Sequence, residues 1–575
     1  MPENKSIINL LDSDDNSLGA VGSPSDTFEA VVDVLEISEK DKLLGELACF
    51  CVKEGDKDVF VLGQTTEITT ENKWHQEPSF KGIIKRHGSL PNLSEVADNR
   101  IAKVSVQSSF ILAEEKSEAH KLANSPSTGV PVKRVNNKIM EKLMEQYEGQ
   151  LVCIGNAYDT DVQIPFWFKH FGKPEEGGGG DAYHIGVFGR TGSGKTTAAA
   201  NMILAYARNN EHMSILILDP QEQFFEDNNV LPDQVSFMGS LEDAGMNYEK
   251  YIVPDEVSLP HLASLFSSLL LNYDFIRKAF RIHTQEKREL MAESIQEYVS
   301  GRMNNSRFSI GEDSDGLLNS MIKRFYESER YTENVYASGG SQLTRLRKRI
   351  GDLADESLEI DNETKEIWDY VCSLFKEDDK EKLDSIVDKV VSNPKNVIVL
   401  NISGRNAVSG MESVQTLFIK IIEDSIKEKG AELYSQGGKS NCLVVLDEAH
   451  RFISTYTYDE DMKELTTSII DAVRTTRKYG IGYMFITQTI ESLHREIREQ
   501  IRIFAFGYGL TSGSEFSQIR NIINDESGAK FYRSFIDPSS NNKFPFMFYG
   551  PVSPLSFTGT PLFLEMQGLI SNFPE

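Results

Sequence analysis

The sequence predicts an α/β protein: a parallel sheet with a small β-barrel before it and a helical insertion within it. From His184 onward, short apolar strands alternate with helical stretches, which is typical of a parallel sheet covered on both faces. From Phe28 to about Val135, short runs rich in Val, Ile and Thr lie between Gly, Pro and Asn breaks, which favours a small β-barrel or a sandwich. From Leu259 to about Val391, a long helical tract contains no comparable strand.

The composition limits the classes of protein to consider. The chain has 575 residues, of which 39% are apolar, enough to build cores and to exclude wholesale disorder. Its 87 acidic and 60 basic side chains leave a formal charge of −27. This charge argues against a protein that binds nucleic acid over its whole surface. A locally basic channel for DNA stays possible, because the field near a surface is set by nearby charges.

Cysteine content and hydropathy indicate the compartment. Five cysteines in a chain of this length are too few for a disulfide framework, so we expect reduced thiols. No apolar run approaches the roughly 20 residues of a membrane helix, and the N-terminus lacks the pattern of a secretory signal. We therefore expect a cytoplasmic protein that makes no membrane contact.

The N-terminal part is predicted in two segments. Residues 1–25 are polar and acidic, and we expect a flexible tail. Residues 26–136 are expected to form the β-barrel domain, and a connecting helix follows at 137–147. The clearest strands of the barrel are predicted at 58–68, 100–112 and 130–135.

The rest of the chain is predicted as one interrupted domain. Residues 137–258 form the first part of the α/β core, 259–391 the helical insertion, and 392–575 the second part of the core with a C-terminal tail. The strands expected in the sheet are Ile185–Phe188, Ile215–Leu218, Val397–Leu400, Leu443–Leu446 and Tyr483–Thr487.

A complete phosphate-binding loop follows the first of these strands. The segment from Gly189 to Thr196 has the pattern G-x-x-x-x-G-K-[ST], with an apolar strand before it and a helix after it. Its glycines let backbone N–H groups close around a phosphate at the N-terminus of a helix. Lys195 is expected to reach the β- and γ-phosphates of ATP, and Thr196 to supply a hydroxyl to Mg²⁺. The nucleotide contacts are expected from Gly189, Arg190, Thr191, Gly192, Ser193, Gly194, Lys195, Thr196 and Thr197.

Two consecutive acids end a later apolar strand. Asp447 and Glu448 follow the run Leu443–Leu446, although they lie far along the chain from the phosphate loop. The helical insertion explains this separation. We expect Asp447 to hold the metal through water, and Glu448 to polarise the water that attacks the γ-phosphate.

Two further features favour a RecA-like ATPase. Gln488 gives a polar end to the strand Tyr483–Thr487 and could sense the γ-phosphate, or it could simply cap the strand. Arg474, Arg477 and Lys478 lie three and four residues apart at the end of a predicted helix, so they share one face. One of the two arginines could reach the nucleotide site of a neighbouring subunit. Alternatively, the cations could interact favourably with the negative end of the helix dipole.

Four segments together resemble the HerA family of hexameric DNA-translocating ATPases, which is grouped with FtsK-like and conjugative DNA pumps. The resemblance covers about residues 30 to 560, including an N-terminal β-barrel. The segments are DAYHIGVFGRTGSGKTT, ILILDPQEQF, VVLDEAHRFI and RTTRKYGIGYMFITQT.

The resemblance assigns roles to matching positions only. It supports Lys195, Thr196, Asp447, Glu448 and Gln488 in the roles given above, and it implies that Asp219 belongs to the nucleotide site. The trans-acting arginine falls on the helix of Arg474 and Arg477, and we prefer Arg477. Gln223 occupies the usual place of a glutamate, which leaves the role of Glu222 open, and we expect His450 to be structural.

The resemblance implies an ATPase that works as a ring, expected to be a hexamer, and moves double-stranded DNA through a central pore. It also implies a partner, either a NurA-like nuclease or a sirtuin-like or other effector in phage defence. Cations expected for the pore are Arg345, Arg347, Lys348, Arg349, Arg405, Arg495, Arg498 and Arg502, although solvated faces or ion pairs are equally ordinary uses of such residues.

Two other functions remain compatible with the sequence. The first is a nucleotide-gated scaffold that assembles and regulates an effector enzyme, which would suit the acidic surface. The second is a conjugation or secretion ATPase, against which the lack of a membrane anchor argues.

Overall fold

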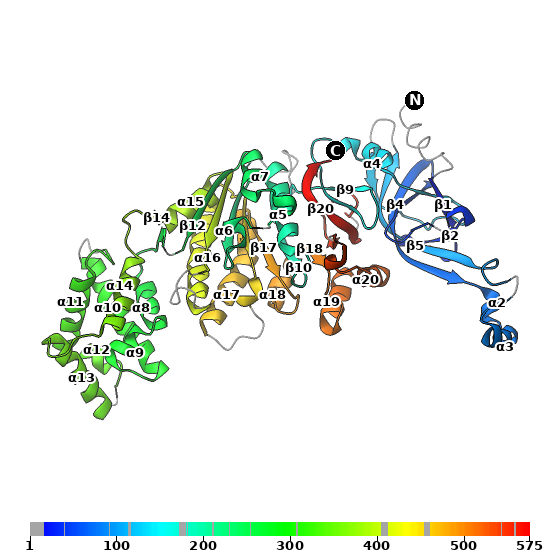
Figure 1. Cartoon of the computed structure of the whole chain (residues 1–575). Helices are drawn as coiled ribbons and strands as arrows, with labels where there is room; N and C mark the ends of the chain where they lie inside the picture. Colours follow the sequence, from blue (N-terminus) through cyan, green and yellow to red (C-terminus); the bar gives the residue numbers. More distant parts are fainter. Residues whose placement is uncertain are drawn as a thin grey trace.

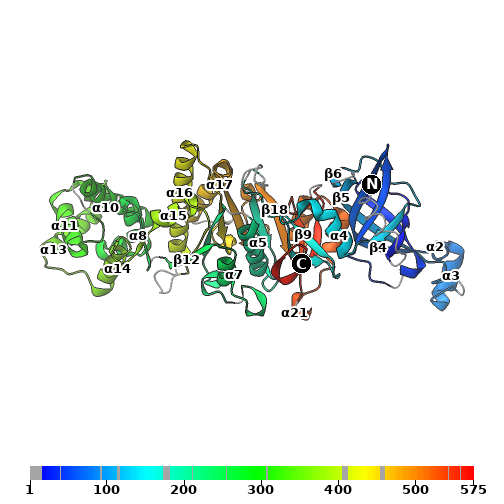
Figure 2. The ribbon, with the colours of Figure 1, turned by 90° about the horizontal axis from the view of Figure 1, so that it is seen from above.

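The computed structural model confirms the predicted α/β class, with a closed barrel, a largely parallel sheet and a helical insertion. These parts follow one another along the long axis of the molecule, with the insertion at the left of Figure 1 and the barrel at the right. The same order is seen from above in Figure 2. The structure describes the chain except residues 1–15, 39–40, 91–92, 113–116, 172–179, 181, 210–211, 229, 254, 306–308, 338, 404–411, 454–459, 542, 557–558 and 575.

Six strands close the barrel in the order β2-β1-β7-β3-β4-β5, and β2 pairs with β5 to complete the ring. Their apolar residues alternate with polar ones, and side chains such as Val32, Val61 and Val104 fill the interior. The strands are β1 (Ser17–Val21), β2 (Glu29–Val34), β3 (Leu47–Glu54), β4 (Lys57–Glu71), β5 (Asn99–Leu112) and β7 (Pro131–Arg134), and β6 (Ser117–His120) adds to β5 outside the ring.

The barrel begins earlier in the chain than the sequence predicts. The strand β1 lies within residues 1–25, for which we expected a tail, so that expectation is wrong for Ser17–Val21. The strand pairs with both β2 and β7, and Leu18 and Val21 are buried. A five-residue run containing a glycine carries too weak a pattern to be found from the sequence. Residues 1–15 lie outside the described residues.

The core sheet has eleven strands in the order β12-β15-β11-β16-β17-β10-β18-β19-β20-β8-β9. The strands from β12 to β18 run parallel, and the remaining four continue the sheet antiparallel. Their bounds are β8 (Val152–Ala157), β9 (Gln163–Phe166), β10 (His184–Phe188), β11 (Ser214–Asp219), β12 (Asn247–Ile252), β15 (Asn396–Asn401), β16 (Cys442–Leu446), β17 (Ile481–Thr487), β18 (Ile501–Gly507), β19 (Phe544–Tyr549) and β20 (Leu562–Asn572).

All five strands predicted for the sheet are confirmed as β10, β11, β15, β16 and β17. Alternate residues of each strand enter different cores, so Ile215 and Ile217 pack on one face of β11 while Leu216 and Leu218 pack on the other. The sheet is therefore buried on both faces, as its continuous apolar runs predict.

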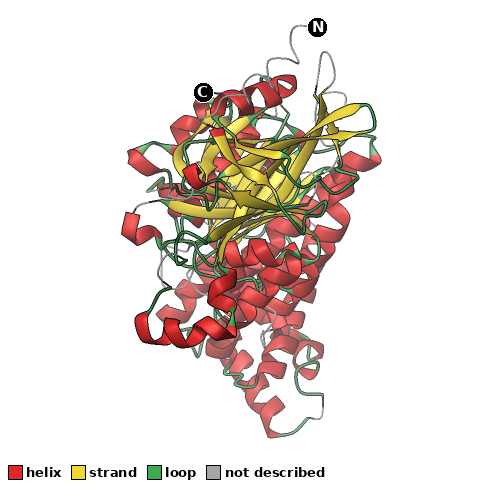
Figure 3. Cartoon of the chain, turned by 90° about the vertical axis from the view of Figure 1, so that its right-hand side faces the viewer, coloured by secondary structure: helices red, strands yellow, loops and turns green. Residues whose placement is uncertain are grey.

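Helices cover both faces of this sheet, because some pack into one of its two apolar clusters and some into the other. Figure 3, in which the barrel stands in front, shows helices around the strands. They are α5 (Lys195–Asn209), α6 (Gln223–Glu226), α7 (Phe237–Asp243), α15 (Leu383–Ser392), α16 (Glu412–Ser435), α17 (Glu460–Thr475), α18 (Arg495–Arg498), α19 (Gly513–Ile523), α20 (Glu526–Tyr532) and α21 (Pro538–Asn541). Among the described residues, no helix has both the length and the apolar character needed to cross a membrane.

The insertion is a bundle of helices whose two connections to the core lie side by side. The short strands β13 (Val257–Ser258) and β14 (Glu381–Lys382) pair at its base. Its helices are α8 (Ala263–Asn272), α9 (Phe275–Phe280), α10 (Gln285–Asn305), α11 (Ser314–Glu327), α12 (Arg330–Glu333), α13 (Ser341–Ala354) and α14 (Asn362–Ser373). Trp368 is fully buried between Phe266 and Phe275, so the bundle has an apolar centre of its own.

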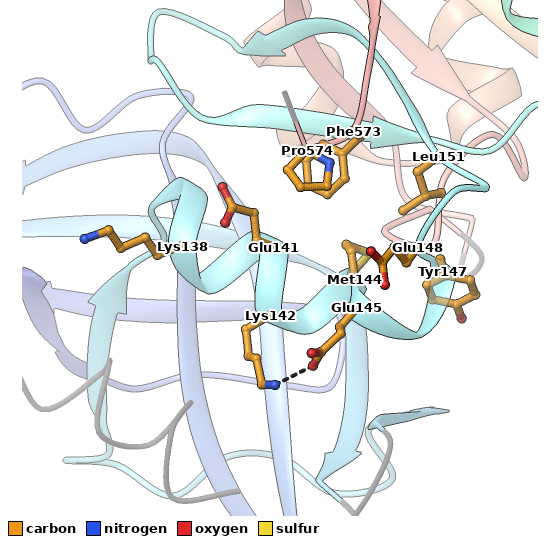
Figure 4. A pocket seen from close by; sticks show the side chains of 10 residues that line it. All are labelled: Lys138, Glu141, Lys142, Met144, Glu145, Tyr147, Glu148, Leu151, Phe573 and Pro574. Atoms are coloured by element: carbon orange, nitrogen blue, oxygen red, sulfur yellow. Dashed lines mark hydrogen bonds and ion pairs between the residues drawn. The ribbon is translucent and has the colours of Figure 1, made fainter. Parts of the chain in front are cut away.

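The barrel and the core share buried contacts. Helix α4 (Asn137–Met144), which confirms the predicted connection, packs in one apolar cluster with barrel and core strands. A cavity of about 730 Å³ lies beside it, between Met144 and Leu151 and the C-terminal residues Phe573 and Pro574 (Figure 4).

A buried glutamine joins the barrel to the core sheet. Gln64 Nε2 donates to Phe563 O at 2.9 Å, and Phe563 N donates to Gln64 Oε1 at 3.1 Å, so this side chain pairs with β20 as a backbone would. Gln64 also donates to Gly45 O and accepts from Gln107. Gln64 is fully buried, so the groups that it bonds cannot turn to water instead. Phe563 O also accepts from Tyr158 N, and Gln107 also donates to Pro561 O.

We predict that Gln64→Ala lowers the free energy of unfolding by about 3 kcal/mol, because it leaves buried backbone groups of Phe563 and Gly45 unpaired. Urea or thermal unfolding measures this change. Gln76→Ala, on the exposed side of α2 (Lys73–Gln76), is the control and should change stability little. Equal stability of the two variants would contradict the bridging role of Gln64.

Glu423 of α16 is buried and accepts a hydrogen bond from Tyr483 Oη at 2.7 Å. Burial, with a smaller effect of Asp424, raises its pKa from 4.5 to about 7. The folded chain therefore keeps this proton between pH 4.5 and 7, where the unfolded chain has lost it. It follows that Glu423 makes the protein less stable as the pH rises through this window.

We predict that Glu423→Gln is more stable than the parent above pH 7, by up to about 3 kcal/mol, and equally stable below pH 4.5. Thermal unfolding across this pH range measures the difference. Glu428→Gln, on an exposed position of the same helix, should show no such pH dependence. A constant difference at every pH would show that the charge of Glu423 is not its cause.

Candidate functional site

The phosphate loop joins β10 to α5 in a strained backbone conformation that its glycines permit. Gly192 and Gly194 have φ of 82° and 84°. A Cβ at Gly194 would lie 2.6 Å from Phe544 Cδ1, so this position needs glycine for space as well as for conformation. Ser193 Oγ is buried and has no hydrogen-bond partner among the described residues. A buried hydroxyl without a partner is a group that a bound ligand can satisfy.

Lys195 begins α5 and is nearly buried, with its Nζ 3.3 Å from Arg190 O. Burial lowers the pKa of Lys195, and the carboxylates of Glu448 and Asp447 oppose that effect. The lysine is thus brought near both predicted acids although they come from a distant part of the chain.

Thr196 and Asp219 meet through the turn after β11. Thr196 Oγ1 donates to Gln223 Oε1 at 2.9 Å. Asp219 is fully buried and accepts from the backbone N–H groups of Gln221, Gln223 and Phe225, which fixes the turn that carries Gln223. Asp219 therefore acts on the site through the position of Gln223. Glu222 points elsewhere, because it accepts from Asn401 and Ser403 near the end of β15.

Asp447 is an almost fully buried acid at the end of β16. Its Oδ2 has no hydrogen-bond partner among the described residues. Burial, followed by the negative charges of Asp219 and Glu448, raises its pKa to about 7. A buried carboxylate oxygen without a donor is suited to a cation.

Mg²⁺ fits this arrangement. The chain offers oxygen ligands, the Thr196 hydroxyl and the Asp447 carboxylate, and Mg²⁺ prefers oxygen ligands from one or two protein groups together with phosphate and water. Among the described residues, no group of three or more His, Cys, Asp or Glu residues is arranged to hold a metal ion.

Glu448 lies in a left-handed conformation, with φ of 46°, directly after Asp447. Its carboxylate lies 3.0 Å from His450 Nδ1 and accepts from Gln488 Nε2 at 3.4 Å. Although burial acts to raise it, the pKa of Glu448 is lowered, because His450, Lys195 and Gln488 surround the carboxylate. Glu448 is thus kept ionised, as a residue that polarises water must be.

The strand order explains why Gln488 is in this group. β17 lies between β10 and β16, with Phe188 opposite Thr487 and Leu446 opposite Phe485. Gln488 therefore leaves the sheet between the phosphate loop and the two acids. The parallel register places the carboxyl ends of all three strands at one edge, where a ligand can contact them together.

The two predicted arginines lie at the opposite edge of the sheet. Helix α17 ends at Thr475, and Arg477 lies in the short 3₁₀ turn Thr476–Tyr479, so the single helical face predicted from the sequence is interrupted. The Arg477 guanidinium stacks 5.7 Å from the centre of the Tyr183 ring, directly before β10. Arg474 forms an ion pair with Glu496. Arg477 therefore lies at the end of β10 opposite to the phosphate loop, and a strand of five residues spans about 16 Å.

The structure also locates most of the cations predicted for a pore. Arg347 pairs with Glu329 and Glu333, and Arg495 pairs with Glu499. Arg502 stacks on the Tyr183 ring, as Arg477 does. The others are Arg498 in α18, Arg345, Lys348 and Arg349 in the insertion, and Arg405, which lies outside the described residues.

Two residues near the site were not predicted to act there. His450 was expected to be structural, but its ring contacts Glu448. Gln223 was noticed only as a departure from a family pattern, and it is the partner of Thr196. Both residues lie within recognisable sequence motifs, so their place in the chain pointed to the site. Their contacts could not be predicted, because these depend on how strands distant in the sequence pair.

Comparison with known proteins identifies the central part of the chain. The family model described as the central domain of helicase HerA matches residues 182–426. A second model, described as zonular occludens toxin (Zot), matches residues 384–506. No curated protein matches the chain.

Several solved structures are similar at low sequence identity. VirB4 of Thermoanaerobacter pseudethanolicus is 12% identical, over 73% of this chain and 97% of that chain, with a TM-score of 0.39. The bacterial conjugative coupling protein TrwBΔN70 is 11% identical, over 76% and 93%, with a TM-score of 0.35. The DNA-packaging ATPase B204 from Sulfolobus Turreted Icosahedral Virus is 16% identical, over 31% and 70%, with a TM-score of 0.21.

We predict that Gly194→Ala destabilises the ligand-free chain by about 2–4 kcal/mol, because it adds a clash with Phe544 to the backbone strain. Gly192→Ala is the matched control, since it has the same backbone conformation but open space at the Cβ, and should cost about 1 kcal/mol. Thermal unfolding without nucleotide compares the two. Equal costs would contradict the contact between the loop and Phe544.

Proposed function

Since residues 182–426 carry a HerA-type central domain, we propose that the chain is a ring-forming ATPase that translocates or unwinds double-stranded DNA. We further propose that it acts with a partner nuclease or another effector, in DNA processing or phage defence. The observation that carries the ATPase proposal is the convergence of Lys195, Thr196, Asp447, Glu448 and Gln488 at one edge of the sheet.

Each of these residues has a chemical role that its surroundings support. Lys195 and the N–H groups of the loop neutralise the β- and γ-phosphates of ATP. Thr196 would hold Mg²⁺ directly and Asp447 through water, and the bound ion would stabilise negative charge on the phosphates. Glu448, ionised and fixed by His450, orients water toward the γ-phosphorus and accepts its proton. Gln488 contacts Glu448 and would report the presence of the γ-phosphate to β17.

In a ring, a neighbouring subunit can supply an arginine to the nucleotide site. Arg477 stacks on Tyr183 at the other end of β10 from the phosphate loop, and a strand of five residues spans about 16 Å. We therefore propose that the arginine that stabilises the transition state comes from a neighbouring copy, one of six in the ring. Opening and closing of this contact during hydrolysis would move each subunit against the next, and with it the DNA.

A nucleotide-gated scaffold is the second candidate. Helices α2 and α3 (Pro78–His87) contain no buried side chain and extend from the barrel at the right of Figure 1. Trp74 and Ile83 are exposed there, which would suit contact with a partner protein. If effector activation survives Glu448→Gln, which retains the nucleotide site but removes the base, the scaffold is favoured over the motor.

The first experiment measures ATP hydrolysis with and without linear double-stranded DNA. We predict that DNA stimulates hydrolysis by the parent chain and that Lys195→Ala reduces it by at least about 100-fold. Lys138→Ala, on an exposed position of α4, is the control and should retain full activity. Normal turnover by Lys195→Ala would refute the site, while hydrolysis unaffected by DNA would count against translocation.

The second experiment tests whether the site is shared between copies. We predict that Arg477→Ala binds ATP normally but hydrolyses it at least about 100-fold more slowly. Mixing it with Glu448→Gln subunits should partly restore hydrolysis, because some interfaces then combine an intact Glu448 with an intact Arg477. Mixtures of Arg474→Ala with Glu448→Gln show whether Arg474 acts instead. A mixture no more active than its components would contradict a shared site.

A further inference from the structure

A second cavity lies in the helical insertion, away from the phosphate loop. Its volume is about 550 Å³, and it is formed by the end of α9, the turn between α9 and α10, and one side of α13. Helices α9 and α13 lie at the left end of Figure 1, whereas α5, which follows the phosphate loop, lies near the centre. Cavities of this size are in the range that holds small ligands, about 300–1,000 Å³.

The cavity is positively charged in an acidic chain. Arg281, Arg345, Lys348 and Arg349 line it, and Asp352 is the one acid among its lining residues in the described ranges. Within the part of the chain that the structure describes, no carboxylate forms an ion pair with any of these four cations. Arg347 on the same helix behaves in the ordinary way, since it pairs with Glu329 and Glu333.

The cations are held close together by the fold. Arg281 ends α9 in a left-handed conformation, with φ of 55°, and Arg349 Nε donates to Ala279 O at 3.1 Å. Burial, followed by the positive charge of Arg281, lowers the pKa of Arg349. The carboxylates of Asp361 and Asp352 oppose this effect, but neither forms an ion pair with Arg349 among the described residues. Like charges are thus held side by side, and a bound anion would relieve their repulsion.

The cavity is also lined by aromatic and apolar side chains. These are Tyr336, Ile282, Leu346 and Leu358, of which Ile282 and Leu346 are buried. A simple anion would leave these side chains without a contact. A ligand that combines phosphate groups with a flat ring would contact both kinds of side chain, with the phosphates on the arginines and the ring against Tyr336.

We propose that this cavity is a second ligand site, which binds a nucleotide through its phosphates at Arg281, Arg345, Lys348 and Arg349 and through its base at Tyr336. The site uses none of the residues of the phosphate loop, and the inference does not depend on the function proposed above.

The test counts ADP bound to the full-length chain by equilibrium dialysis. We expect two classes of site in the parent protein. Arg345→Ala/Lys348→Ala should weaken one class by at least about tenfold, because charge-assisted contacts to phosphate are lost. Both side chains are exposed, so the variant should fold normally. Arg347→Ala is the control, because it removes a cation from the same helix but not from the cavity, and should leave both classes intact.

Lys195→Ala separates this inference from the proposed function. It should weaken the other class and leave the cavity site unchanged, whereas the combined variant should lose both. A binding curve of Arg345→Ala/Lys348→Ala that coincides with that of the parent would overturn the cavity site. A curve of Lys195→Ala that coincides with the parent would instead count against the phosphate loop.

Inorganic pyrophosphate tests the contact with the base. In the Lys195→Ala background, ADP should bind the cavity at least about tenfold more tightly than pyrophosphate, and Tyr336→Ala should remove that advantage. Equal binding of ADP and pyrophosphate would overturn the assignment of the ligand as a nucleotide.

Discussion

The parallel register of β10, β17 and β16 is the constraint on which the rest of this structure depends. It aligns Phe188, Thr487 and Leu446 at one edge, so that the phosphate loop, Gln488 and the two acids leave the sheet together. The same register holds Tyr183 and the arginines stacked near it at the other edge. Because these strands are buried on both faces, the distance between the two edges cannot change without unfolding the core.

Unpaired buried polar atoms and an unusual backbone conformation occur at the edge of the sheet that carries the phosphate loop. Ser193 Oγ and Asp447 Oδ2 are buried polar atoms without partners among the described residues, and Glu448 has a left-handed backbone. Each costs stability and is the kind of feature that persists where a ligand completes the structure. The barrel is fixed to the same sheet through Gln64 and β20, so movement of the sheet would carry the barrel with it.

The sequence predicted the elements with strong apolar patterns and the residues within a complete motif. The buried strands β10, β11 and β16 are continuous apolar runs, and the phosphate loop has fixed spacing, so both could be found without a structure.

The strand β12 was missed, because its sequence NYEKYI is half-exposed and lacks such a run. The strand β18 and the four antiparallel strands were also missed, and the pairing of β20 with β8 joins segments from opposite ends of the core domain. The contacts of His450 and Gln223 depend on the same long-range pairing, and the break after Thr475 has no signal in the apolar stripe of α17.

The central claim is that the nucleotide site becomes complete only between two copies of the chain. The most direct measurement follows ATPase activity per chain through a dilution series while the particle mass is recorded on the same samples. If the claim is correct, activity per chain falls as the assembled particle gives way to single chains. Undiminished activity in samples that contain only the 64.7 kDa chain would contradict it.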